Sequence, residues 1–190
     1  MLYIVFALFP RGHFFLTIPR NNVALAAAFL AKTHGVRVAV LDVDVHAGDG
    51  TMLIFKNCED ILTVSLHVDP KFEYPYVYGH AHESNASNLN VPLPPKTQWR
   101  EYSRALAGAL ERMKAFDAPF WLIAFGADTY KDDPDMSNIS GLSLDLSDYT
   151  SMGQQIRLAA GNREILVTAE GGYCMEKVPF CRAMLRCCHG

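Results

Sequence analysis

The sequence contains no run of lysine or arginine, and this absence bears on the kind of partner the protein can hold. Its 17 basic and 20 acidic residues give a formal net charge of -3 at pH 7. A chain without a basic patch cannot neutralise a phosphate backbone, so we expect no direct contact with nucleic acid. With 50% hydrophobic and 19% charged residues, the chain instead predicts a single folded domain over residues 1–190.

An apolar stretch, MLYIVFALF, opens the chain at residues 1–9. It is too short to span a bilayer and has no basic residues before it, so we expect no membrane contact. We favour a buried strand as its interpretation. The alternative is a secretory signal peptide, although no A-x-A cleavage pattern follows the stretch.

The five cysteines include no CxxC pair, and four of them are crowded near the C-terminus. An odd number without paired spacing indicates reduced thiols in an intracellular protein, cytoplasmic or, if the source is a eukaryote, nuclear. The adjacent Cys187, Cys188 and His189 suggest metal binding as an alternative. We do not favour it, because chain ends are usually poorly ordered.

Short β-rich runs alternate with helical patterns along the chain. The runs predict buried parallel strands at residues 36–42, 61–66, 120–125 and 164–169. Apolar residues spaced three and four apart predict helices at residues 22–34, 98–116 and 147–160. This alternation is typical of an α/β fold with a mainly parallel sheet flanked by helices. Residues 69–96 show no period and predict a long functional loop or a pair of loops.

Charged side chains follow the first predicted strand, where the chain reads LDVDVHAGDG. While the chain stays extended, alternate side chains share a face, so Asp42, Asp44 and His46 point the same way. Like charges so close together repel unless a cation compensates them, and the spacing therefore predicts a metal site. The alternative is a strand that runs into an Asp-rich turn bent by its glycines.

Two later strands end in a similar manner. The third predicted strand runs into GAD, which ends at Asp128, and the fourth runs into EGGY, which ends at Tyr173. Ligands in open α/β sheets collect beyond the carboxyl ends of the strands, and glycine lets the backbone approach them. Two carboxylates and the imidazole of His46 leave a coordination position open, as a catalytic zinc requires. Taken singly, each motif is also typical of an ordinary turn or loop.

The order of these motifs resembles the histone deacetylase and acetylpolyamine amidohydrolase superfamily. The matching blocks run from about Asn21 to about Val178 and read LDVDVHAGDGT, ILTVSLHVDP, EYPYVYGHAHE, LNVPLP, GADTYKDDP and EGGY. The loops are more similar to the bacterial acetylpolyamine amidohydrolase branch than to the nuclear enzymes. The resemblance implies a three-layer arginase/deacetylase-like fold. Because the family's first strands and helices have no counterpart in this chain, the sheet is expected to be incomplete at the N-terminus.

The resemblance also implies a reaction and the residues that perform it. Asp44, His46 and Asp128 match the zinc ligands, and Tyr173 matches the phenol that hydrogen-bonds the substrate carbonyl. The implied reaction is hydrolysis of the amide of acetyl-lysine or of an acetylated polyamine, with the metal polarising the carbonyl and a water molecule.

Further residues match a second ion site and the substrate channel of the family. The backbone near Asp42, together with Ser65 and Leu66, matches a structural potassium site. Tyr74 matches an aromatic wall of the channel, with an ordinary loop tyrosine as the alternative, and Gly126 is also expected to line the channel.

One block of the family has no match in the sequence. The family takes its general base and acid from two adjacent histidines upstream of an Asn-Asn pair, and this chain has Asn21 and Asn22 but no adjacent histidines. The PRGH sequence that ends at His13 is only faintly similar to the block. His13 is therefore a candidate acid-base residue, with a solvated loop histidine as the alternative. Because acid-base catalysis contributes roughly a hundred- to ten-thousandfold, we expect a metal site with feeble turnover.

Other functions fit parts of the pattern. The same scaffold without turnover would be a metal-binding or interaction module, which would bind zinc and leave amides intact. A two-metal hydrolase of the arginase type needs more bridging ligands than the residues after His46 supply. A Rossmann-type nucleotide binder is disfavoured, because no G-x-G-x-x-G follows an early strand. The sequence leaves the oligomeric state and the natural substrate open.

Overall fold

The computed structural model of the chain describes residues 4–6, 21–135, 140–174 and 176–177. Its elements, in chain order, are β1 (Ile4–Phe6), α1 (Asn22–His34), β2 (Val38–Asp42), α2 (Asp49–Ile54), β3 (Ile61–Val68), the 3-10 helix η1 (Ala81–Glu83), β4 (Asn88–Leu93), α3 (Trp99–Phe116), β5 (Phe120–Phe125), α4 (Leu146–Ala160) and β6 (Glu164–Ala169). None of the described helices combines the length and apolar character needed to cross a bilayer.

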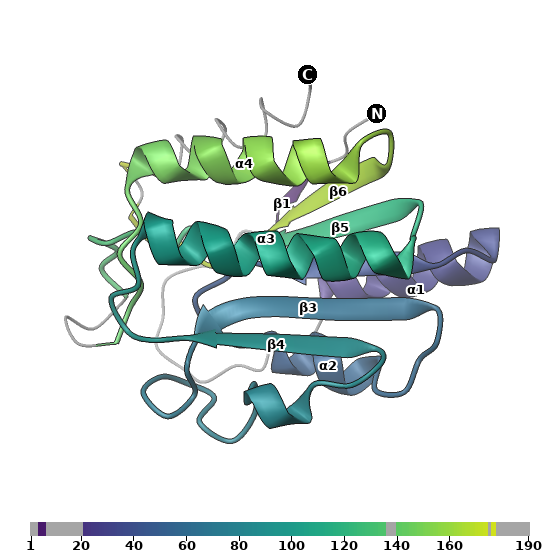
Figure 1. Cartoon of the computed structure of the whole chain (residues 1–190), viewed down its shortest axis with the longest axis horizontal. Coiled ribbons are helices and arrows are strands. Elements are labelled where there is room, and N and C mark those ends of the chain that lie inside the picture. The colour runs from purple at the N-terminus through teal and green to yellow at the C-terminus, as the bar shows by residue number, and fades with distance from the viewer. Residues whose placement is uncertain (1–3, 7–20, 136–139, 175, 178–190) are drawn as a thin grey trace.

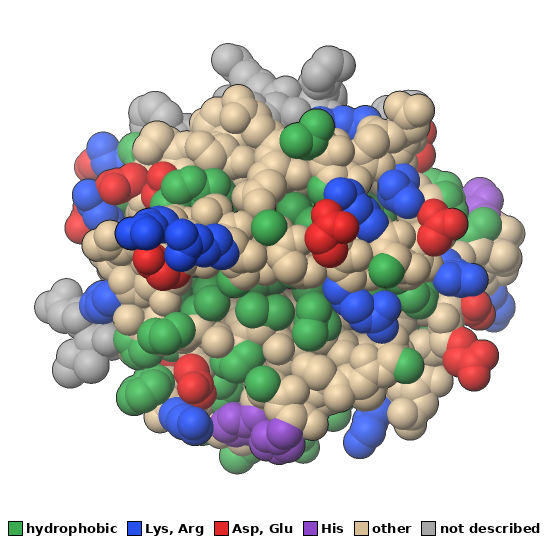
Figure 2. Space-filling model, viewed as in Figure 1, with side chains coloured by type: hydrophobic (Ala, Val, Ile, Leu, Met, Phe, Trp, Pro, Cys, Tyr) green, Lys and Arg blue, Asp and Glu red, His purple; other side chains and the backbone are tan. Residues whose placement is uncertain are grey.

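The described strands form one sheet in the order β1-β6-β5-β2-β3-β4, and every neighbouring pair is parallel. Helices α3 and α4 cover one face of the sheet, and α1 and α2 lie behind it (Figure 1). On the face that α3 and α4 form, acidic and basic side chains are interspersed (Figure 2). The molecule is therefore a three-layer α/β structure with a parallel sheet, as the sequence predicts.

Strand β2 shows why a continuous apolar run predicts a buried parallel strand. Ala39 and Leu41 pack into the hydrophobic core beneath α3 and α4, whereas Val38 and Val40 pack into a second core with α1. All four side chains are at most 1% exposed. Because both faces of the strand are covered, the polar-apolar alternation of a half-exposed strand is lost.

Helix α1 begins and ends where its sequence indicates. The Asn21 side chain accepts a hydrogen bond from the Ala24 amide at 2.8 Å and donates one to Thr51 Oγ1 at 2.8 Å. The helix ends at Gly35, whose φ of 62° is a left-handed conformation that glycine adopts at little cost. The cap therefore satisfies a free amide of the first turn and ties α1 to α2.

We expect Asn21→Ala to lower the free energy of unfolding by about 1–2 kcal/mol, because it removes an N-cap bond and the bond to Thr51. Urea unfolding followed by circular dichroism measures the effect. Gln154→Ala, on the exposed side of α4, is the control and should change the value by less than about 0.5 kcal/mol. Equal stability of the two variants would show that the cap contributes nothing.

Residues 69–96, predicted as one long loop or a pair of loops, contain η1 and β4, so a single unbroken loop is excluded. Polar residues within β4 obscure its strand pattern. Asn88 and Asn90 are buried; Asn88 Oδ1 accepts from the Thr63 hydroxyl, and Asn90 Nδ2 donates to the His80 carbonyl. Pro92 is tolerated because β4 is the edge strand of the sheet, where a missing amide donor costs little. At the other edge, β1 agrees with the strand predicted in residues 1–9.

The strand order also determines where the polar turns lie. Strands β6, β5 and β2 are direct neighbours and run in the same direction. The segments that follow them therefore emerge side by side at one edge of the sheet. These segments carry the motifs LDVDVH, GAD and EGGY.

Candidate metal centre

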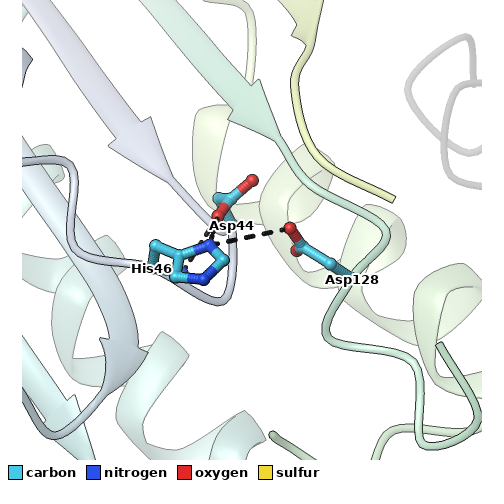
Figure 3. A group of neighbouring side chains, drawn as sticks. All are labelled: Asp44, His46 and Asp128. Carbon is cyan, nitrogen blue, oxygen red and sulfur yellow. Dashed lines mark hydrogen bonds and ion pairs between the residues drawn. The ribbon is translucent and has the colours of Figure 1, made fainter. Parts of the chain in front are cut away.

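Three predicted ligands lie together beyond the ends of β2 and β5. Asp44 and His46 come from the bend after β2, and Asp128 from the turn after β5 (Figure 3). One nitrogen or oxygen atom from each residue lies within 4.8 Å of the others. His46 Nδ1 is 3.1 Å from Asp44 Oδ1 and 3.9 Å from Asp128 Oδ2. The structure thus brings together the imidazole and the two carboxylates that the sequence indicated.

The alternation predicted after β2 persists although the strand itself ends at Asp42. Val43 and Val45 are fully buried, while Asp42, Asp44 and His46 are only partly buried. The apolar side chains anchor the bend in the core beneath α3 and α4. The polar ones are thereby directed to the opposite side.

Backbone amides hold the two carboxylates in place. Asp44 Oδ1 accepts from the His46 amide at 2.9 Å, and Asp44 Oδ2 accepts from the Gly171 amide at 3.0 Å. Asp128 Oδ1 accepts from the Val45 amide at 3.0 Å. The second oxygen of Asp128 is buried and has no hydrogen-bond partner among the described residues. A buried carboxylate oxygen without a donor is costly, and a cation bound between Asp128 and His46 would remove that cost.

Two glycines leave room for these carboxylates. A Cβ atom at Gly126 would lie 2.3 Å from Asp44 Oδ2, and one at Gly171 would lie 1.9 Å from Asp128 Oδ2. Neither distance is compatible with a real side chain, so both positions require glycine. Gly126, predicted in the substrate channel, therefore lies beside the two carboxylates.

The ionisation of the cluster reflects the crowding of its charges. Burial and the Asp44 charge raise the pKa of Asp128 well above its usual value, and the same two causes act on Asp42. Burial opposes ionisation of Asp44, but the bonds and the charge of His46 outweigh it and lower the pKa of that carboxyl. Burial disfavours the imidazolium form, yet Asp44 leaves the pKa of His46 raised. A bound cation would compensate these charges, and the donor set of one imidazole and two carboxylates fits zinc.

Tyr173 lies in the segment after β6, two residues beyond the Gly171 amide that bonds Asp44. Its side chain is 51% exposed, and the described residues give its hydroxyl no hydrogen bond. Burial of the remainder and the charge of Asp128 raise the pKa of Tyr173 to about 12. At neutral pH the phenol is therefore protonated and available as a donor.

Tyr74 also reaches the cluster. Its ring meets the His46 ring edge-on, with the centroids 6.1 Å apart and the planes at 72°. Tyr76 packs edge-on against Tyr74 in turn, with the ring centroids 6.5 Å apart. Tyr74 and Tyr76 are 43% and 58% exposed, so together they form an aromatic rim beside the imidazole.

The residues predicted around a potassium ion lie behind the cluster. Asp42 pairs with Ser65 across the β2–β3 ladder, and Leu66 is the next residue on β3. The Ser65 hydroxyl oxygen accepts from the Gly48 amide at 3.1 Å and lies 2.8 Å from His67 Nδ1. These contacts place the predicted residues together behind the ligand-bearing bend.

His67 is a site residue that the sequence did not single out. It is fully buried, and its Nε2 bonds the Gly79 carbonyl at 2.8 Å. Because a carbonyl only accepts, Nε2 carries the proton and Nδ1 accepts from the Ser65 hydroxyl. Burial lowers the pKa of His67, which favours this neutral form. The imidazole thus fastens the loop that carries Tyr74 to β3.

Asp133 is a second such residue. It is 4% exposed, and its carboxylate bonds the amides of Tyr173 and Cys174. The local sequence DDPD is typical of any acidic loop, and the partners of Asp133 lie 40 and 41 residues away, so local spacing did not reveal its role. His13, predicted as an acid-base candidate, lies outside the described residues, as do Cys187, Cys188 and His189.

Comparisons with known proteins agree with this geometry. Residues 19–187 match the histone deacetylase domain. The chain is 42% identical over 165 residues to acetylpolyamine amidohydrolase 2 of Pseudomonas aeruginosa, covering 83% of this chain and 46% of that protein. It is 32% identical over 183 residues to histone deacetylase 8 of Arabidopsis thaliana, covering 87% of this chain and 46% of that protein. The chain thus spans about half the length of these curated relatives.

A solved structure shows the same fold. The crystal structure of an acetylpolyamine aminohydrolase from Burkholderia pseudomallei superposes with a TM-score of 0.82 at 30% identity. The match covers 90% of this chain and 49% of that one. It confirms the three-layer arrangement implied by the resemblance.

Proposed function

Because the chain belongs to the histone deacetylase family, we propose that its metal centre serves the hydrolysis of an acetylated amine by zinc-dependent chemistry. The observation that carries the proposal is the buried, unpartnered Oδ2 of Asp128 beside the imidazole of His46. A purely structural carboxylate would be expected to find a donor at that depth. Asp44, His46 and Asp128 would hold the ion.

Bound zinc would polarise the amide carbonyl and lower the pKa of a water molecule toward neutrality. The protonated phenol of Tyr173 would donate to the oxygen of the carbonyl as it acquires negative charge. Asp42 Oδ1, which accepts from the Asp44 amide at 3.0 Å, would keep the ligand-bearing bend in position. A potassium ion near Asp42, Ser65 and Leu66 would stabilise the same bend from behind.

The rim of the site favours a positively charged acetylated amine, such as an acetylated polyamine, over a neutral amide. Burial lowers the pKa of His46, but Asp44 and, after it, the charges of Glu73 and Asp135 raise it, so both of these carboxylates act at the site. Tyr74 adds an aromatic face on which a cationic chain can pack. Relatives of this chain carry the name acetylpolyamine amidohydrolase. Acetyl-lysine in a peptide has the same reacting group and is the second substrate class.

The expected turnover is slow, because the 190 residues contain no two adjacent histidines to move protons. His13 is the remaining acid-base candidate in the first 20 residues. A metal-binding or interaction module, which holds zinc and hydrolyses nothing, is the alternative that this feature favours.

The test combines zinc binding with amide hydrolysis by the 190-residue protein. We expect one zinc ion per chain, and slow release of acetate from N-acetylputrescine and from an acetyl-lysine peptide. A chelator should stop the release and added zinc should restore it. Failure to bind zinc would overturn the proposal. Zinc binding without hydrolysis would support the non-catalytic module, and rapid hydrolysis would contradict the slow turnover expected without paired histidines.

A further inference from the structure

The carboxylate of Asp133 is almost fully enclosed by backbone amides of two loops. Its Oδ2 accepts from the Tyr173 amide at 2.8 Å and from the Cys174 amide at 3.1 Å. Its Oδ1 accepts from the Asp135 amide at 3.0 Å. The side chain is only 4% exposed, so these bonds are shielded from water.

The loops after β5 and β6 are built to meet at this carboxylate. The Ala127 amide donates to the Gly171 carbonyl at 2.8 Å, which joins the two loops at their start. Gly172 follows with a φ of 120°, and a Cβ there would lie 2.6 Å from the Cβ of Ala127. Glycine therefore permits both the close approach and the turn after which two consecutive amides donate to Asp133.

Tyr173 depends on this backbone anchor because its side chain has little else to hold it. The side chain is half exposed, and its hydroxyl has no partner in the described part of the chain. A phenol that donates to a developing oxyanion must be held close to its working geometry before the reaction. In this structure the orientation of Tyr173 comes from its backbone.

We propose that Asp133 is a positioning residue for Tyr173, whose carboxylate fixes the Tyr173–Cys174 backbone and thereby aims the phenol. This inference rests on the proposed function for the role of Tyr173. The hydrogen bonds described for Asp133 come from the Asp135, Tyr173 and Cys174 amides and include none to the predicted metal ligands. Asp133 connects the loop that supplies Asp128 to the loop that supplies the phenol, so the two move as one unit.

The test is Asp133→Asn, which keeps the shape of the side chain. In one orientation the NH2 group of the new side chain meets the Tyr173 and Cys174 amides, and both bonds are lost. In the other it meets the Asp135 amide, and the neutral amide oxygen accepts from Tyr173 and Cys174 more weakly than the carboxylate did. We expect the Tyr173 and Cys174 amides to exchange their hydrogens roughly tenfold faster. We also expect kcat to fall about tenfold with KM and zinc affinity unchanged. Asp132→Asn, an exposed neighbour with the same change in charge, should alter none of these quantities.

A double variant separates positioning from a general structural effect. If Asp133 acts through Tyr173, adding Asp133→Asn to Tyr173→Phe should lower kcat no further; an undiminished further loss would overturn the proposal. Unchanged exchange of the two amides in Asp133→Asn would also overturn it. If the wild-type protein hydrolyses nothing, the proposed function fails, and amide exchange still decides the anchor.

The wild-type protein offers a measurement that does not depend on the folding of any variant. The amide of Gly172 has no acceptor among the described residues, whereas those of Tyr173 and Cys174 donate to Asp133. The latter two should exchange at least about tenfold more slowly than Gly172. Equal rates at the three positions would refute the anchor.

Discussion

Gly171→Ala is expected to weaken zinc binding by about a hundredfold. The new methyl group would lie 1.9 Å from Asp128 Oδ2 and 2.5 Å from Asp44 Oδ2. The loop cannot simply retreat, because the Gly171 amide donates to Asp44 and its carbonyl accepts from Ala127. Either a carboxylate rotates out of the cluster or these bonds break. Competition with a chromophoric chelator measures the loss of affinity.

Gly108→Ala is the matched control for this variant. Gly108 lies within α3, and a Cβ there would meet nothing within 4 Å. Its zinc affinity should equal that of the wild type, and its free energy of unfolding should rise by roughly 0.5–1 kcal/mol because alanine favours the helix. If Gly171→Ala bound zinc as tightly as Gly108→Ala, the two carboxylates could not be the ligands in the arrangement described.

Tyr173→Phe is expected to weaken binding of a tetrahedral transition-state analogue by about a hundredfold. A suitable probe is the hydrate of a trifluoromethyl ketone with the side chain of acetyl-lysine. The phenol is protonated at neutral pH, and burial and nearby carboxylates favour this form further by raising the pKa of Tyr173 to about 12. Phenylalanine preserves the ring and removes only the donor. Calorimetric titration of zinc-loaded protein measures this loss without requiring fast turnover.

Two comparisons make the Tyr173 result specific. Zinc affinity should be the same in Tyr173→Phe and the wild type, because the hydroxyl is not among the predicted ligands. Tyr78→Phe removes a hydroxyl from the loop after β3 and should leave analogue binding unchanged. Undiminished analogue binding by Tyr173→Phe would remove the phenol from the mechanism.

The elements that could be predicted from the sequence are those whose residue pattern follows from a single local property, such as burial of a strand or a glycine at the end of a helix. Strands β5 and β6 were predicted at their observed bounds, because each is a continuous apolar run and β5 is buried on both faces. Helix α1 was predicted at its observed bounds because Gly35 stops it. Strand β4 was missed because its buried asparagines bond side chains and backbone that lie elsewhere in the fold.

The candidate site divides in the same way. Asp44 and His46 could be predicted because alternation within a short segment places them on one side. Asp128 required the further rule that ligands collect at the carboxyl ends of parallel strands. Asp133 and His67 could not be predicted, because their importance lies in bonds to distant backbone atoms that leave no trace in local spacing.

The order of the strands has a thermodynamic consequence for an ion held at their ends. The Val45 amide and the Asp128 carboxylate that it bonds are 83 residues apart along the chain, and they meet only when β2 and β5 pair. In the unfolded chain the three ligands are dispersed, so an ion that needs all of them would bind the native state alone. The free energy of unfolding would then depend on the concentration of free metal. Each tenfold rise above the dissociation constant would add about 1.4 kcal/mol to it. The metal site would therefore stabilise the native pairing of β2 and β5 by an amount that depends on the free metal concentration around the protein.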